Sequence, residues 1–169
     1  LEINTDIQGT PASLAIDRLR LNLPGYLALQ ASGKVDNPLD FNRFSGRVNI
    51  DGTIGKLNSL KGAFLSKQLA SQVNIPPSRI KGNIIYSPGN IDGDVKVTTA
   101  AGDVALDGKW NDRAQGYQAT LKAHSFPVNA FMPGLGIGKV TADVKLSGRG
   151  YNPASRASHM KADVDLTAL

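Results

Sequence analysis

The feature that most constrains this fold is the alternation of apolar and polar side chains along short segments of the chain. Residues 140–146 show it most clearly, with apolar side chains at the even positions and Thr141, Asp143 and Lys145 at the odd ones. Successive side chains of a β-strand point to opposite faces, so this period of two predicts a strand. The pattern recurs at residues 19–23, 27–31, 47–51, 94–98, 103–107, 117–123 and 161–166.

The segments between these strands carry turn residues. Pro-Gly pairs lie in 23–25 and 87–90, residues 101–103 form a tight link, and residues 111–116 form a longer loop. Proline sets the first dihedral of a turn and glycine tolerates positive φ. A parallel crossover needs a dozen or more residues, so connections this short predict an antiparallel meander. We therefore expect an all-β fold, with the meander curled into an open trough or closed into a sandwich.

Two segments depart from the alternation. In residues 64–73 the apolar positions approach helical spacing, and Pro76 and Pro77 follow, so we expect one short helix there. Residues 126–133 are apolar and bracketed by prolines, which allows at most a single helical turn. Such a turn could cap a core or plug the end of a groove.

A weak repeat of an apolar residue, a polar residue and a glycine runs through the chain. Its copies end at Gly9, Gly52, Gly62, Gly82, Gly93, Gly108 and Gly148. The irregular spacing argues against a solenoid, and we interpret the glycines as places where strands end or bulge. Residues 6–13 also resemble residues 145–155, and the chain begins at Leu1. These features predict one β-rich segment, 1–169, excised from a longer protein.

The amino-acid composition excludes some functional classes and argues against others. The absence of cysteine excludes disulfides and thiolate chemistry. The net charge of +5 comes from scattered basic residues, which is typical of a solvated surface, with attraction to anionic lipid headgroups or nucleic acid as the alternative. Aromatic residues make up only 6%, which argues against a nucleic-acid partner that stacks its bases. No apolar run approaches the ~20 residues that span a bilayer.

The candidate catalytic and phosphate-binding motifs in the sequence are incomplete. The glycine-rich segment 134–139 has Pro133 where a phosphate loop needs its first glycine, and it precedes a strand instead of a helix. His124 and His159 lie far apart in the sequence, with no carboxylate at a ligand spacing. The aspartates lie in turns or on polar strand faces. We therefore expect no enzyme activity, no metal and no cofactor.

Several segments together resemble the AsmA/TamB family of Gram-negative envelope proteins. They are residues 103–111, 117–123, 126–132 and 138–150, which follow an order of strand, Leu-x-Gly, strand, short apolar turn and a further strand ending in Gly-x-Gly. The resemblance covers residues 80–166 well and residues 1–55 more loosely. The predicted helix at 64–73 departs from the family pattern.

The resemblance implies a sheet curled lengthwise, known as a β-taco, with an apolar trough inside. It implies a periplasmic location within an inner-membrane-anchored parent that serves outer-membrane biogenesis. The implied role is lipid transport or protein assembly, without catalytic residues. The implied partners are lipid acyl chains or unfolded outer-membrane polypeptide, together with the outer-membrane assembly machinery.

The alternating strands supply a candidate apolar groove. Its residues are Val95, Val97, Val104, Leu106, Ala119, Leu121, Val140, Ala142, Val144 and Leu146. The same residues could instead meet each other in the core of a sandwich. The alternative function is a carbohydrate- or protein-binding β-sandwich, whose site would be an exposed aromatic platform around Trp110, Tyr117 and Tyr151.

Overall fold

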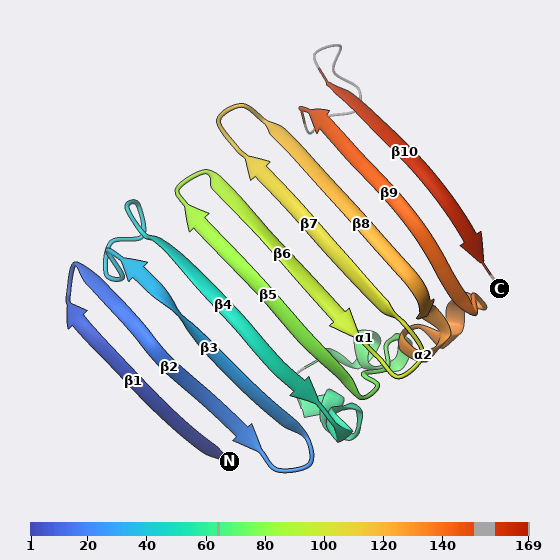
Figure 1. The fold of residues 1–169 in the computed structure, drawn as a ribbon, viewed down its shortest axis with the longest axis horizontal. Coiled ribbons are helices and arrows are strands. Elements are labelled where there is room, and N and C mark those ends of the chain that lie inside the picture. Colours follow the sequence, from blue (N-terminus) through green and yellow to red (C-terminus); the bar gives the residue numbers. More distant parts are fainter. Residues whose placement is uncertain (64, 151–157, 169) are drawn as a thin grey trace.

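In the computed structural model, which describes residues 1–63, 65–150 and 158–168, ten strands form one sheet in sequence order (Figure 1). The strands are β1 (Glu2–Thr10), β2 (Ser13–Leu23), β3 (Leu27–Asp36), β4 (Ser45–Ile54), β5 (Ser78–Ser87), β6 (Asn90–Thr98), β7 (Asp103–Asn111), β8 (Gly116–Pro127), β9 (Lys139–Arg149) and β10 (His159–Ala168). Every neighbouring pair is antiparallel. The predicted all-β antiparallel meander is confirmed.

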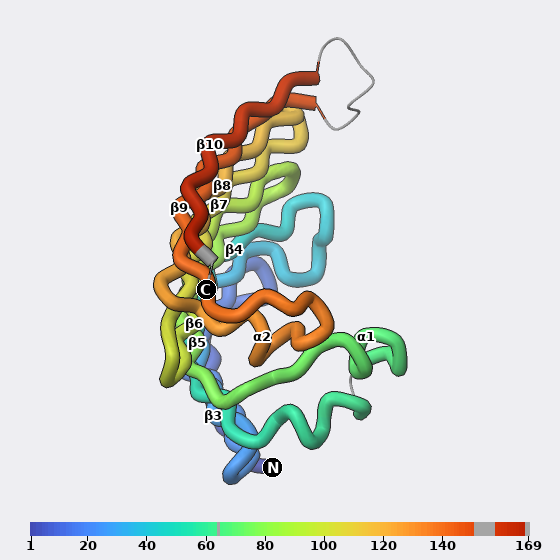
Figure 2. Tube along the Cα trace, turned by 90° about the vertical axis from the view of Figure 1, so that its right-hand side faces the viewer, coloured from blue at the N-terminus to red at the C-terminus, as the bar shows by residue number. Residues whose placement is uncertain are grey.

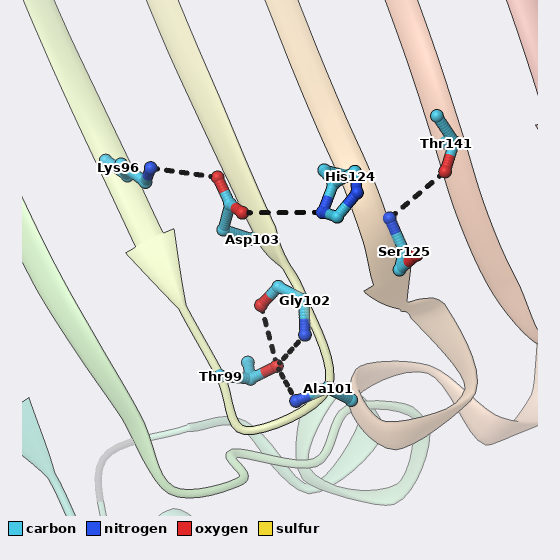
Figure 3. A network of polar contacts seen from close by, with 8 residues as sticks. All are labelled: Lys96, Thr99, Ala101, Gly102, Asp103, His124, Ser125 and Thr141. Atoms are coloured by element: carbon cyan, nitrogen blue, oxygen red, sulfur yellow. Dashed lines mark hydrogen bonds and ion pairs between the residues drawn. The ribbon is translucent and has the colours of Figure 1, made fainter.

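The predicted turns lie between consecutive strands. The tight link from β6 to β7 is held by the hydroxyl of Thr99, whose Oγ1 accepts hydrogen bonds from the N–H groups of Ala101 and Gly102, both at 3.1 Å (Figure 3). The same hydroxyl donates to the carbonyl oxygen of Gly102 at 2.8 Å. These bonds therefore satisfy the turn backbone locally, within residues 99–102.

The predicted helix is confirmed but is shorter than residues 64–73. It is α1 (Lys67–Gln72), preceded by a 3₁₀ segment, η1 (Lys56–Ala63). Residue 64 lies outside the described residues. The start is set by Ser66, whose Oγ accepts a hydrogen bond from the N–H of Leu69 at 3.3 Å. Extended backbone at Val73 ends the helix.

The single helical turn expected in residues 126–133 is also present. It is α2 (Val128–Phe131), followed by a second short 3₁₀ segment, η2 (Pro133–Leu135). Gly136 then adopts a left-handed conformation with a φ of 64°. Both helical connections lie at the same end of the sheet (Figure 1).

The interpretation of the repeat glycines is confirmed for Gly9 and Gly148, each next to last in its strand, and was wrong for four others. Gly52, Gly82, Gly93 and Gly108 lie inside β4 to β7, and the register shifts occur elsewhere, after Asp6, Ile16 and Ala123. In the copies that lie within strands, the apolar residue and the glycine are two positions apart, so they share a face and the polar residue points the opposite way. The copy that ends at Gly62 lies in η1 instead. The repeat is therefore strand alternation in which glycine occupies a position on the apolar face.

Three of these glycines, Gly52, Gly82 and Gly93, are required by close approach of a neighbouring strand. A β-carbon on Gly52 would lie 2.8 Å from the carbonyl oxygen of Ala28, and one on Gly93 would lie 2.7 Å from that of Asn83. Backbone oxygens in a paired strand cannot move aside cheaply. Glycine therefore lets the strands pair without strain at these points.

The sheet remains open, and no second sheet packs against it in the described part of the chain. Only Ala123 and Ala142 are buried hydrophobic residues there, each 8% exposed. Figure 2 shows the sheet bowed in side view, with the connections that carry α1 and α2 on its hollow side. Of the two predicted architectures, the structure has the open, curled one.

Candidate functional site: the apolar face

Directly paired residues on neighbouring strands point to the same face of a sheet, so the register shows what each face carries. One row crosses the whole sheet through Thr5, Leu19, Ala31, Ile50, Gly82, Val95, Leu106, Leu121, Val144 and Val164. Apart from Thr5 on the edge strand, this row is made of aliphatic residues and glycine, and so are the rows two residues to either side. We call the surface formed by these rows the apolar face.

The structure places every predicted groove residue on this apolar face, over β6 to β9. Val95, Leu106, Leu121 and Val144 stand side by side in one row. The next row contains Val97, Val104 and Ala142, and the row on the other side contains Ala119 and Leu146. Val140 pairs with Phe126 beyond the bulge in β8.

The sequence prediction missed that the apolar face continues over β1 to β5. Ile3 pairs with Leu21, which pairs with Leu29, and Val48 pairs with Ile84. The signal was present, because residues 19–23, 27–31 and 47–51 alternate in the same way. At the edges the face is open to solvent, with Ile3 59% exposed on β1 and Val164 62% exposed on β10.

The helical connections cover one end of the apolar face. Phe126 lies on this face beside Val140, and its ring stacks on that of Phe131 in α2 with centroids 4.9 Å apart. The carbonyl oxygen of Phe131 accepts a hydrogen bond from the N–H of Asn74 at 2.6 Å. This bond ties the β8–β9 connection to the β4–β5 connection, so the two form one cover.

An aromatic row crosses the opposite end of the apolar face. Tyr86, Ile91, Trp110 and Tyr117 are direct partners on β5 to β8. The Tyr117 ring extends over Gly148 of β9, where a β-carbon would overlap it. Trp110 and Tyr117, two residues of the predicted aromatic platform, therefore stand side by side on the sheet, and Trp110 is 43% exposed. Tyr151, the third residue of the predicted platform, lies outside the described residues.

The opposite face is polar and carries cross-strand ion pairs. Asp92 pairs with Lys109 at 3.1 Å, and Asp103 pairs with Lys96 at 3.0 Å (Figure 3). The register also brings Nδ1 of His124 to 4.0 Å from Asp103, a proximity that sequence spacing did not predict. The cationic partners are at least 55% exposed and the two aspartates are 30% and 43% exposed, so solvent screens each pair and it adds little stability. Within the described ranges, no group of three or more His, Asp or Glu residues is arranged to hold a metal ion.

Asp51 joins β4 to β5 on this polar face. It contacts Arg79 at 3.1 Å and Lys81 at 3.4 Å. The hydrogen bond from Arg79, assisted by Lys81, lowers the pKa of the Asp51 carboxyl below its usual value of 3.8.

This lowered pKa predicts a pH dependence. A carboxyl with a depressed folded-state pKa stabilises the fold above its unfolded pKa, and that contribution disappears as pH falls through the folded value. Asp51→Asn should therefore lower the melting temperature slightly at neutral pH, and the gap from the wild type should close below pH 3.8. Thermal unfolding followed by circular dichroism across pH measures this gap. A gap of equal size at every pH would contradict the assignment.

Comparison with protein-family models, with curated proteins and with solved structures finds no match for this chain. In the part of the chain that the structure describes, no helix is long and apolar enough to span a membrane.

Proposed function

We propose that this chain is a non-catalytic module of a periplasmic, AsmA/TamB-like protein, and that its apolar face holds lipid acyl chains during transport. The observation that carries the proposal is the apolar face itself. It runs from β1 to β10 without interruption, while the opposite face of the same strands is polar. A single layer with one such face exposes a contiguous apolar surface, and surfaces of that kind mark sites that bind a partner or a ligand.

The chemistry of the face suits hydrocarbon. Its side chains are mainly Val, Leu, Ile, Ala and Gly, which offer dispersion contact and no directional hydrogen bonds. β8 has 12 residues, which at ~3.4 Å per residue give a path of about 40 Å. That length exceeds the ~15 Å hydrocarbon depth of one bilayer leaflet. An acyl chain can therefore lie along a strand with its whole length in apolar contact.

Unfolded outer-membrane polypeptide is the second candidate cargo, and the sheet edges favour it. β1 pairs only with β2, and β10 pairs only with β9, among the described strands. An extended polypeptide can add to such an edge through main-chain hydrogen bonds. In that role the module would work with the outer-membrane assembly machinery, in the periplasm where the parent protein lies.

Photo-crosslinking tests the proposal with a matched pair of positions. Val164 and Asp165 are neighbours on β10 and are both exposed, but Val164 lies on the apolar face and Asp165 on the polar one. A benzoylphenylalanine at position 164 should crosslink to phospholipid mixed with the purified chain, and one at position 165 should not. Equal crosslinking at the two positions, or none at either, would overturn the assignment of acyl chains to this face.

A further inference from the structure

The connection between β3 and β4, residues 37–44, presents two large apolar side chains to solvent. Leu39 is 83% exposed and Phe41 is 86% exposed, and no other large hydrophobic residue in the described ranges is as exposed as either. They belong to neither the apolar face nor the helical cover. Single exposed apolar residues are common on soluble surfaces. These two differ because they stand two positions apart in one short loop and are the most exposed large hydrophobic residues of the described ranges.

The loop that holds them is ordered by its own hydrogen bonds. The N–H of Asn37 donates to the carbonyl oxygen of Ala12 at 2.7 Å, and its Nδ2 donates to that of Arg43 at 3.1 Å. The N–H of Asp40 donates to the carbonyl oxygen of Asn37, and Asp40 Oδ1 accepts from the N–H of Asn42, both at 3.0 Å. These bonds pre-organise the loop, so little conformational entropy is lost when its apolar side chains bind.

The loop lies at the aromatic end of the apolar face, away from the helical cover (Figure 1). Phe44, its last residue, packs against Tyr86 with ring centroids 5.5 Å apart. Tyr86 begins the aromatic row that continues through Trp110 and Tyr117. Trp and Tyr favour the headgroup level of bilayers, where one part of the ring is apolar and another is hydrated.

We propose that the loop 37–44 docks this end of the sheet into the surface of a lipid bilayer, with Leu39 and Phe41 inserted among the acyl chains. This deepens the proposed function, on which it rests, because it brings the uncovered end of the apolar face to the membrane that supplies or receives lipid. The loop carries one exposed anion, Asp40, and one exposed cation, Arg43, so the docking rests on its apolar side chains and not on net charge.

The size of the feature favours a bilayer over a protein partner. A stable protein interface buries about 800 Å² per partner and needs a broad complementary patch. Two side chains on a projecting loop cannot supply that area. They can supply an interfacial anchor, because each fully buried apolar side chain contributes free energy on entering hydrocarbon without any shape match.

Vesicle co-sedimentation of the 169-residue chain tests this docking. The probe is vesicles of equal parts phosphatidylethanolamine and phosphatidylglycerol. The double variant Leu39→Ser with Phe41→Ser should partition at least about tenfold more weakly than the wild type. The matched control is Leu135→Ser with Ile137→Ser, which removes two exposed apolar side chains, 53% and 40% exposed, at the opposite end of the sheet. That control should bind vesicles like the wild type.

A fluorescence measurement locates the loop within the bilayer. Trp110 is the only tryptophan, so Phe41→Trp in a Trp110→Phe background places a single emitter at the loop tip. Its emission should shift to the blue on adding vesicles, and lipids brominated on their acyl chains should quench it. An unshifted, unquenched emission would overturn the insertion of Phe41.

Two further outcomes would overturn the inference while leaving the proposed function in place. One is a wild-type chain that crosslinks lipid at position 164 but does not sediment with vesicles, which would point to a protein partner for the loop. The other is an equal loss of sedimentation in the loop variant and in the control variant, which would mean that vesicle binding is general to exposed apolar residues. The loop variant should still crosslink lipid at position 164. Its loss of vesicle binding then tests the docking of the loop and not the binding of acyl chains by the apolar face.

Discussion

Replacing Val144 with aspartate is expected to weaken the binding of an apolar fluorescent dye, such as N-phenylnaphthylamine, by tenfold or more. Val144 stands in the central row of the apolar face, between Leu121 on β8 and Val164 on β10. A carboxylate there stays ionised at neutral pH by recruiting water, and that water must be displaced when hydrocarbon covers the site. Dye fluorescence titrated against protein concentration measures the loss.

The control for this experiment lies on the same strand. Ser147 is three residues from Val144, so its side chain points to the polar face, between Gln118 and Lys161. Ser147→Asp adds the same charge to β9 and should leave dye binding unchanged. Circular dichroism should show that both variants keep the sheet. Equal loss of dye binding in the two variants would show that the dye senses overall charge and not the apolar face.

The largest stability effect is expected at Gly33. A β-carbon at this position would overlap the carbonyl oxygen of Arg47 in β4 and crowd the Cα of Val48. Both are backbone atoms of a paired strand, and β2 on the other side already bulges between Ile16 and Leu19. Gly33→Ala should therefore destabilise the fold by about 3 kcal/mol, since neither neighbour can yield without breaking the ladder.

Gly108 provides a matched comparison for Gly33. The two glycines occupy the same row of the apolar face, linked through Val48, Ile84 and Gly93. At Gly108 an added β-carbon would meet only the carbonyl oxygen of Gln118, at an ordinary 3.7 Å. Gly108→Ala should change stability by no more than about 1 kcal/mol, in the stabilising direction. Urea unfolding followed by Trp110 fluorescence compares them, and similar losses for both would contradict the steric argument.

Much of the fold could be predicted from local sequence. Alternation identified eight of the ten strands, all but β1 and β5, because side-chain direction in a strand depends only on the backbone of that strand. The turns at Pro24 and Gly89 were predictable because proline and glycine act through their own dihedrals. The helix was placed with less accuracy, since its start depends on the capping hydrogen bond from Leu69 N–H to Ser66 Oγ.

Features that depend on contacts between residues distant in the sequence were not predicted. The proximity of His124 to Asp103 depends on the register of β7 with β8, which a spacing of 21 residues in the chain does not reveal. The repeat glycines were assigned to strand ends because glycine is usually unfavourable inside a strand. Their actual role depends on how closely a neighbouring backbone approaches, as Ala28 does at Gly52. That distance is a property of the assembled sheet.

The sequence by itself determined that this chain forms antiparallel strands, each with one apolar and one polar side. It left open whether the apolar sides of two layers meet in a sandwich or stay uncovered on one layer, because both arrangements satisfy the same period of two. The tertiary structure decided this point. All ten strands pair in sequence order into a single curved sheet, and helical connections cover only one end of its apolar face. Burial is therefore nearly absent from the described chain, since a single layer has nothing to pack against.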